Sequence, residues 1–156
     1  MQNAECNILH SAFCILHSSL LAATLVLLGG CGQLRELPTA PIDSDLPDPA
    51  ATFTRIQNEI FTPTCSVFGC HDPETMQAGM TLVAGRSYGM IVGRPSSERP
   101  QLLRIAPGDP ASSYLYLKIT GAPGIDGDRM PQGQLPLPDA QIRLIRDWIR
   151  RGAPND

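Results

Sequence analysis

The chain has 156 residues, of which 42% are hydrophobic and 17% charged, with 12 basic and 15 acidic side chains and a formal net charge of -3 at pH 7. This length fits one domain with an appendage, and the near-balanced charge argues against a nucleic acid or another strongly charged partner. Three of the five cysteines and two of the three histidines lie in the first 31 residues. The role of that segment therefore decides how many of these side chains are available for chemistry.

Residues 1–30 are predicted to be a signal peptide of the lipoprotein type. They end in an apolar run that is too short to span a bilayer and suits the core of a signal peptide. The run ends in Leu28-Gly29-Gly30-Cys31, which resembles a bacterial lipobox. We therefore expect a lipid on Cys31 and an exported protein in the periplasm or cell envelope, held to a membrane by that anchor. No Lys or Arg precedes the run, which suggests a start further downstream; an uncleaved apolar helix is the alternative.

Residues 31–51 contain four prolines and have neither helical nor strand periodicity. A chain rich in proline favours an extended form of about 3.1 Å per residue, so a segment of this length reaches up to about 60 Å. We predict that it is a tether between the anchor and a folded domain at residues 52–154.

The first and last elements of that domain are predicted to be helices. Near its start, apolar side chains recur on one helical face, and Pro63 is expected to end that helix. Near its end, an apolar stripe follows Pro138 and stops at Gly152, which predicts the clearest helix of the chain. Trp148 belongs to that stripe and is expected in the core, with a role beside a cofactor as the alternative. The stripes comprise Phe53, Ile56, Ile60 and Phe61 in the first helix and Ile142, Ile145, Trp148 and Ile149 in the last.

The middle of the domain is predicted to hold shorter elements separated by long loops rich in glycine and proline. Residues 87–92 suit a brief helix, 102–105 an extended segment and 107–110 a turn. A further helix is expected from residues 111–113 to Gly121. The fold class is therefore all-α, a small domain of three to five helices.

Cys65-Ser66-Val67-Phe68-Gly69-Cys70-His71 is the stretch that carries chemistry. Two thiols able to form thioethers with haem vinyl groups, followed at once by an imidazole for the iron, are what covalent haem attachment needs. The usual spacing is C-x-x-C-H, whereas here four residues separate the cysteines. Gly69 is expected to let the longer loop turn back. The alternative is a disulfide between Cys65 and Cys70; a zinc site fits less well because further ligands are lacking.

Met130 is the candidate for the second iron ligand because it lies in an irregular loop, in the sequence Arg129-Met130-Pro131. A thioether opposite a histidine raises the reduction potential of a haem. Met76 and Met80 follow His71 closely, and Met90 lies in a predicted helix, so these three are weaker candidates. Asp126 and Asp128 in the same loop would suggest calcium only weakly.

Together these features resemble a class I cytochrome c domain, of the kind found in exported proteins of planctomycetes and myxobacteria. The resemblance covers about residues 52–153 and rests on the Cys/Cys-His loop, on Ala106-Pro107-Gly108-Asp109-Pro110 with Ser113-Tyr114-Leu115-Tyr116, on Arg129-Met130-Pro131 and on the closing helix. It implies a covalent haem c with thioethers at Cys65 and Cys70 and iron ligands His71 and Met130.

The expected function is one-electron transfer to and from redox partner proteins, without catalysis by the chain itself. Only one histidine follows Cys31, which leaves little room for a hydrolytic constellation. The alternative is a haem-free lipoprotein module, stapled by a Cys65–Cys70 disulfide, with a binding or structural role.

Overall fold

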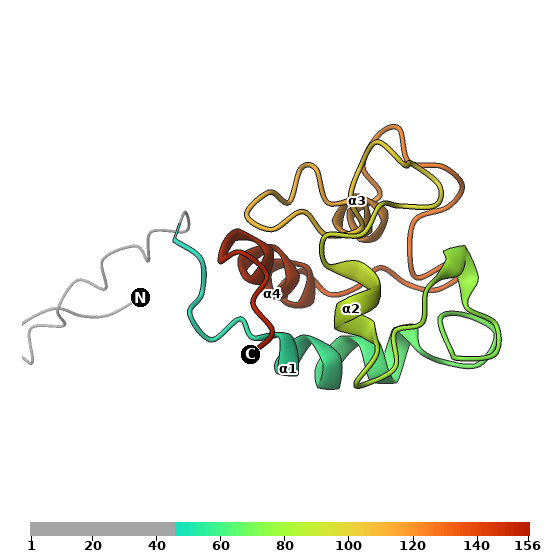
Figure 1. Ribbon diagram of the computed structural model, residues 1–156, viewed down its shortest axis with the longest axis horizontal. Coiled ribbons are helices and arrows are strands. Elements are labelled where there is room, and N and C mark those ends of the chain that lie inside the picture. The colour runs from blue at the N-terminus through green and yellow to red at the C-terminus, as the bar shows by residue number, and fades with distance from the viewer. Residues whose placement is uncertain (1–45) are drawn as a thin grey trace, which may run out of the picture. The chain divides into compact units, whose positions relative to one another are not determined.

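The computed structural model describes residues 46–156 (Figure 1). The predicted signal peptide, the predicted lipidation site Cys31 and most of the predicted tether lie outside the described residues. The described part is helical, as predicted. Its loops are joined by isolated β-bridges, and none of the described residues belongs to a β-strand. Its helices are α1 (Phe53–Ile56), η1 (Gln57–Cys65), η2 (Gln77–Gly79), α2 (Ser87–Ile91), α3 (Tyr114–Thr120) and α4 (Asp139–Arg150).

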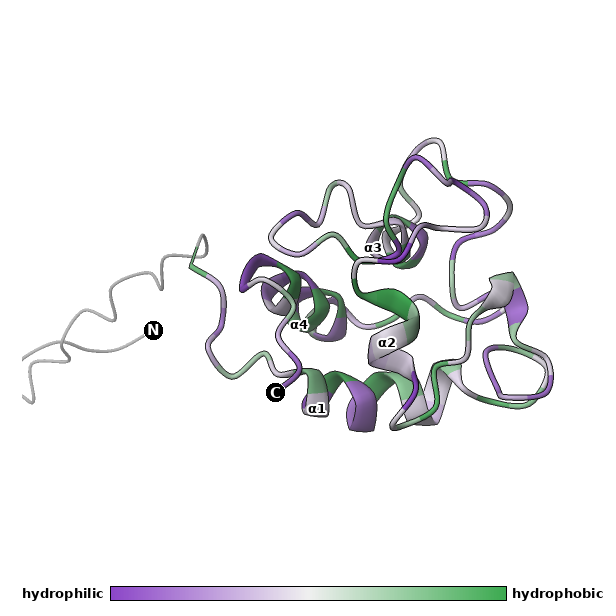
Figure 2. Cartoon of the chain, viewed as in Figure 1, coloured by the Kyte–Doolittle hydropathy of each residue, from purple (hydrophilic) through white to green (hydrophobic). Residues whose placement is uncertain are grey.

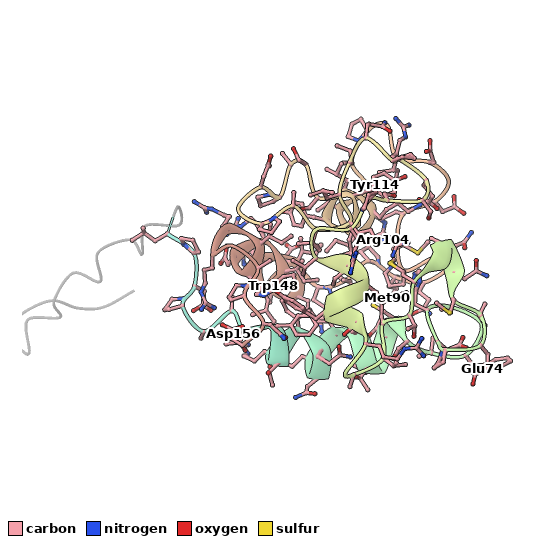
Figure 3. All side chains as sticks on the ribbon, viewed as in Figure 1. Glu74, Met90, Arg104, Tyr114, Trp148 and Asp156 are labelled. Atoms are coloured by element: carbon pink, nitrogen blue, oxygen red, sulfur yellow. The ribbon has the colours of Figure 1, made fainter. Side chains whose placement is uncertain are left out.

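The first helix begins where the sequence predicts, and both ends of the domain hold it there. The Thr52 hydroxyl accepts a hydrogen bond from the Arg55 amide at 3.2 Å and so caps α1. Asp156 accepts from the Phe53 amide through its carboxylate at 2.8 Å and from the Thr54 amide through its carbonyl at 2.9 Å. These bonds satisfy amide groups that the first turn of a helix leaves unpaired. Figure 3 shows Asp156 beside the start of α1.

The prediction that Pro63 ends this helix is wrong. The chain continues without interruption from α1 into η1, a π-helix that contains Pro63 and ends at Cys65. A proline in an α-helix clashes with the carbonyl four residues earlier, whereas the wider turn of a π-helix has bonds between residues five apart. The bond from the Ser66 amide to the Phe61 carbonyl, at 2.8 Å, has that spacing. As a result Cys65 belongs to the helix and is held by it.

The last helix confirms the predicted amphipathic pattern, and Figure 2 shows polar and apolar residues alternating along α4. Trp148 has no exposed surface, and its indole N–H donates to the Pro154 carbonyl at 2.8 Å. Its ring lies 5.4 Å from that of Phe53, measured between centroids. Trp148 is therefore a core residue that joins α4 to α1.

Helix α4 packs against both α1 and α3, and the apolar side chains of these three helices form one core. The packed region begins slightly before Thr52, because Ala51 has no exposed surface and its carbonyl accepts from the Arg151 guanidinium. The predicted extended segment 102–105 bridges two neighbouring segments, at Val92 and Ser113. Within residues 46–156, none of the helices has the length and apolar character needed to cross a membrane.

Candidate functional site

A cavity of about 250 Å³ lies between the helices and the long loops. Apolar side chains of η1, α3 and α4 form much of its wall, and exposed residues in the surrounding loops show that it opens at the surface. Its lining combines the end of η1, the loop from Gly69 to His71, one face of α3, the loop around Met130, and Ile145. It also includes Gln77, Ala78, Met80, Leu82, residues 96–98 and Arg104.

Cys65, Cys70, His71 and Met130, the four predicted site residues, all line this cavity. They come from the end of η1, from the loop after it, and from a loop 59 residues further along the chain. Met80 also lines the cavity, so two of the four methionines in the described part of the chain face the same space. Met80 was a weaker candidate in the sequence because it follows His71 closely. In the structure it shares the cavity with Met130, so both methionines have to be tested as the second ligand.

Cys65 and Cys70 are free thiols, and both are half-buried. Burial, with a smaller contribution from nearby Cys70, raises the pKa of the Cys65 thiol to about 12. At neutral pH Cys65 is therefore protonated, whereas binding of a metal ion by a cysteine requires the thiolate.

The loop between the cysteines is closed by backbone hydrogen bonds. The His71 amide donates to the Cys65 carbonyl, and the Cys70 amide donates to the Val67 carbonyl, each at 3.1 Å. Gly69 has φ of +83°, in the region that favours glycine, which confirms the expectation that it turns the longer loop back. The four-residue spacer thus forms an ordered turn that delivers both sulfurs to one cavity.

Asp72, which the sequence argument did not single out, anchors this turn. Its carboxylate accepts hydrogen bonds from the amides of Gly69 at 2.8 Å, Glu74 at 2.9 Å and Thr75 at 3.0 Å. These amide bonds, chiefly that of Thr75, hold the pKa of Asp72 well below its usual range. An aspartate directly after the histidine and before a proline is the sequence signal that would have revealed this local cap.

The His71 imidazole is buried, and Nδ1 lies 3.0 Å from the Gln77 carbonyl oxygen. A carbonyl can only accept, so Nδ1 carries the proton and Nε2 keeps its lone pair. Burial is the largest cause that lowers the pKa of His71, which favours this neutral form. The His71 carbonyl is bound as well, by the Leu82 amide at 2.8 Å and the Thr81 hydroxyl at 3.0 Å. Both the position and the tautomer of this ring are fixed.

The residues on either side of Gln77 adopt a backbone conformation that is costly for side chains with a Cβ. Met76 has φ of 46° and Ala78 has φ of 54°. Such conformations cost about 1–2 kcal/mol each in ordinary residues and persist only where surrounding contacts impose them. The Ala78 carbonyl accepts from the Arg104 guanidinium at 2.9 Å and from the Ser97 hydroxyl at 2.8 Å.

Arg104 also binds the Met90 carbonyl, at 2.8 Å, so one guanidinium joins α2 to the segment that contacts His71 (Figure 3). Burial lowers the pKa of Arg104. A single arginine inside the apolar segment Leu-Leu-Arg-Ile signals a charge with partners in the interior, and that signal was missed.

Met130 is positioned by α3, because its amide donates to the Lys118 carbonyl at 2.9 Å. Lys118 is buried and lines the cavity, and its ammonium lies 3.4 Å from the Glu98 carboxylate. The position of Lys118, between two apolar residues of a predicted helix and four residues after Tyr114, was a usable signal for a buried charge. Sequence reasoning missed both residues of this pair.

In the described part of the chain, no three His, Cys, Asp or Glu side chains are grouped so that they could hold a single metal ion. Asp126, weighed in the sequence for calcium, instead forms a bidentate pair with Arg99 at 2.8 and 2.9 Å. The donors that share the cavity are two thiols, one neutral imidazole and thioether sulfurs. Thiols can form thioethers to a haem, and an imidazole or a thioether sulfur can bind its iron.

Comparison with known proteins gives no match: no family model, no curated protein and no solved structure matches this chain.

Proposed function

We propose that this protein is a small electron carrier that holds a covalent haem c in the cavity, as cytochrome c domains do. The observation that carries the proposal is that Cys65, Cys70, His71 and Met130 line one cavity, although Met130 lies 59 residues from His71. These four residues were selected from motif chemistry alone. Their convergence on one apolar space supports the proposal.

Each of the four side chains has a role that its chemistry allows. Cys65 and Cys70 would hold the haem through thioether bonds, and His71 and Met130 would bind its iron. The haem would supply one electron at a time through its iron, at a potential set by these ligands and by burial. The apolar wall from Phe61, Leu115 and Ile145 would keep water away from the ring.

Further residues of the chain support this assignment by preparing the site before any cofactor enters. The Gln77 carbonyl fixes the tautomer that leaves Nε2 of His71 available. A hydrogen bond of this kind also makes the ligating nitrogen more basic. Asp72 and Gly69 hold the longer spacer in a turn, so the departure from the usual cysteine spacing does not separate the sulfurs from the cavity.

The cellular setting remains part of the proposal. Export, a lipid on Cys31 and attachment to a membrane in the periplasm or cell envelope rest on residues 1–45, which lie outside the described residues. Redox partner proteins would exchange electrons with the domain at the end of its tether.

The test is to produce the full chain with a cytochrome c maturation system and to extract it with acidified acetone. We expect haem absorption to stay with the polypeptide, and mass spectrometry to find haem on a peptide containing Cys65 and Cys70. Cys65→Ser and Cys70→Ser should each leave one thioether, and the double variant should lose the haem on extraction. Complete loss of haem from the unaltered chain, with Cys65 joined to Cys70, would overturn the proposal in favour of a disulfide-stapled, haem-free module.

A further inference from the structure

Every polar group of Asp126, four residues before Met130, is bound. Its amide donates to the Tyr114 hydroxyl at 2.9 Å, and its carbonyl accepts from the Lys118 ammonium at 2.6 Å. Its carboxylate accepts from Nε of Arg99 at 2.8 Å and from Nη2 at 2.9 Å. Asp126 is thus an anchor point, fixed to α3 by its backbone and to the loop before Leu102 by its side chain.

Lys118 binds this part of the chain twice. Its ammonium holds the carbonyl of Asp126, and its own backbone carbonyl accepts from the amide of Met130 at 2.9 Å. The segment from Asp126 to Met130 is therefore attached at both ends to one residue of α3. Movement of the Met130 backbone away from the cavity must break at least the second of these bonds.

The groups that hold the segment differ in burial, so their removal should weaken the segment to different degrees. Tyr114 and Lys118 are one helical turn apart and are 4% and 7% exposed. Hydrogen bonds made by such buried side chains are costly to lose, because a buried polar group left without its partner has little water to replace it. The side chains of Arg99 and Asp126 are 35% and 49% exposed, so their ion pair is screened and contributes less.

We propose that Tyr114, Lys118 and Arg99 are positioning residues for Met130, which they hold at the cavity through Asp126. In the haem-loaded protein they would set how often Met130 leaves the iron and lets an added ligand reach it. This second statement rests on the proposed function, whereas the first concerns the chain alone and can be tested without cofactor.

The first experiment measures hydrogen exchange of the Met130 amide by NMR in the full chain without haem. Tyr114→Phe removes one hydroxyl and keeps the ring. Tyr88→Phe is the matched control, because the Tyr88 hydroxyl donates to the Ala153 carbonyl at 2.9 Å, away from this segment. We expect Tyr114→Phe to speed exchange at Met130 about two- to tenfold, the factor that one hydrogen bond supplies, and Tyr88→Phe to leave it unchanged.

Arg99→Gln is a second variant, in an exposed side chain whose loss does not threaten folding, and it should give a smaller increase of about twofold. Equal exchange rates at Met130 in the unaltered chain, Arg99→Gln and Tyr114→Phe would overturn the proposal. If Tyr114→Phe does not fold, the Arg99→Gln comparison decides alone.

The second experiment uses the haem-loaded protein and measures the rate at which imidazole displaces Met130. Tyr114→Phe should raise this rate by about the same two- to tenfold factor, and Tyr88→Phe should not. If haem is attached but the rates are equal, the positioning role is overturned and the electron carrier stands. If no haem attaches, the proposed function fails and the exchange experiment still decides the positioning role.

Discussion

The two sides of the cavity are built in different ways. On the His71 side, the hydrogen bonds of that residue go to Cys65, Gln77, Thr81 and Leu82, all within 11 residues of it. The more distant Arg104 and Ser97 reach this side through the neighbouring Ala78 carbonyl. On the Met130 side, the nearest anchor is Lys118, and Asp126 depends on Tyr114 and on Arg99, which is 27 residues away.

The two sides therefore differ in how much of the fold must form before each is in place. A short segment supplies the amides and carbonyls that bind His71 itself, with little loss of chain entropy. The Met130 segment is bound by residues of α3 and by Arg99, so it takes its position only once α3 has formed and the loop that carries Arg99 lies beside it. We therefore expect the Met130 side to open more easily than the His71 side, because local stability follows the number of buried contacts that must break.

The largest expected effect comes from removing what the two sides share. Phe61 is 1% exposed, lines the cavity and contacts Phe53 edge to face at 6.3 Å between centroids. Phe61→Ala should lower the free energy of unfolding by about 3–5 kcal/mol and reduce protection on both sides together. Denaturant unfolding followed by circular dichroism measures the free energy of unfolding, and hydrogen exchange of the His71 and Met130 amides measures the protection of each side. Phe61→Leu is the milder control. A loss of protection confined to one side would show that Phe61 does not support both sides of the cavity.

A second change separates the two sides. In the haem-loaded protein, Met130→Ala should abolish the sulfur-to-iron charge-transfer band of a Met/His site and allow carbon monoxide to bind. It should also lower the reduction potential by on the order of 0.1 V, within the range of about 0.8 V that axial ligands span.

Met80→Ala is the matched control for that experiment, because Met80 lines the same cavity. It should leave both the band and the potential in place. The opposite pattern, with Met80→Ala abolishing the band, would place both iron ligands in the local turn and remove the contrast between the two sides.

The smallest effect is a pH dependence of the Met130 side. The hydrogen bond from Arg99, with its charge, lowers the pKa of Asp126 below the ordinary value of 3.8. The ion pair therefore stabilises the native segment fully above the ordinary pKa, and this contribution is lost as the pH falls through the lowered native value. Lys118 is the other cation near Asp126, and Glu98 and Tyr114 complete its charged and polar surroundings.

Hydrogen exchange at Asp126 and Met130, corrected for intrinsic rates, should accordingly show increasing opening as the pH falls from about 5 towards 3. Asp126→Asn should remove most of this dependence and leave the backbone bonds to Tyr114 and Lys118 possible. As a control, Glu59→Gln removes the exposed Arg55–Glu59 pair, at 3.0 Å, and should not affect these amides. A pH dependence that survives in Asp126→Asn would assign it to another group.

The sequence predicted those features that depend on residues close together in the chain. The apolar spacing of Phe53, Ile56, Ile60 and Phe61 was enough to predict a buried helical face, and that of α4 to predict Trp148 in the core. Gly69 was expected to turn the spacer, and its positive φ agrees. Local rules failed at Pro63, because they assume α-helical hydrogen bonding, and the π-helix bonds residues five apart.

What only the tertiary structure decided is the environment of each chemical group. No local pattern indicates that Arg104 would bind the carbonyl of Ala78, or that Lys118 would face the same cavity as His71. A buried charge is stable only where carbonyls or opposite charges meet it, and those partners come from segments brought together by packing. The sequence by itself therefore determined which residues could form a site, and the contacts of the Met130 segment with α3 and Arg99 decided where Met130 lies and which side chains hold it there.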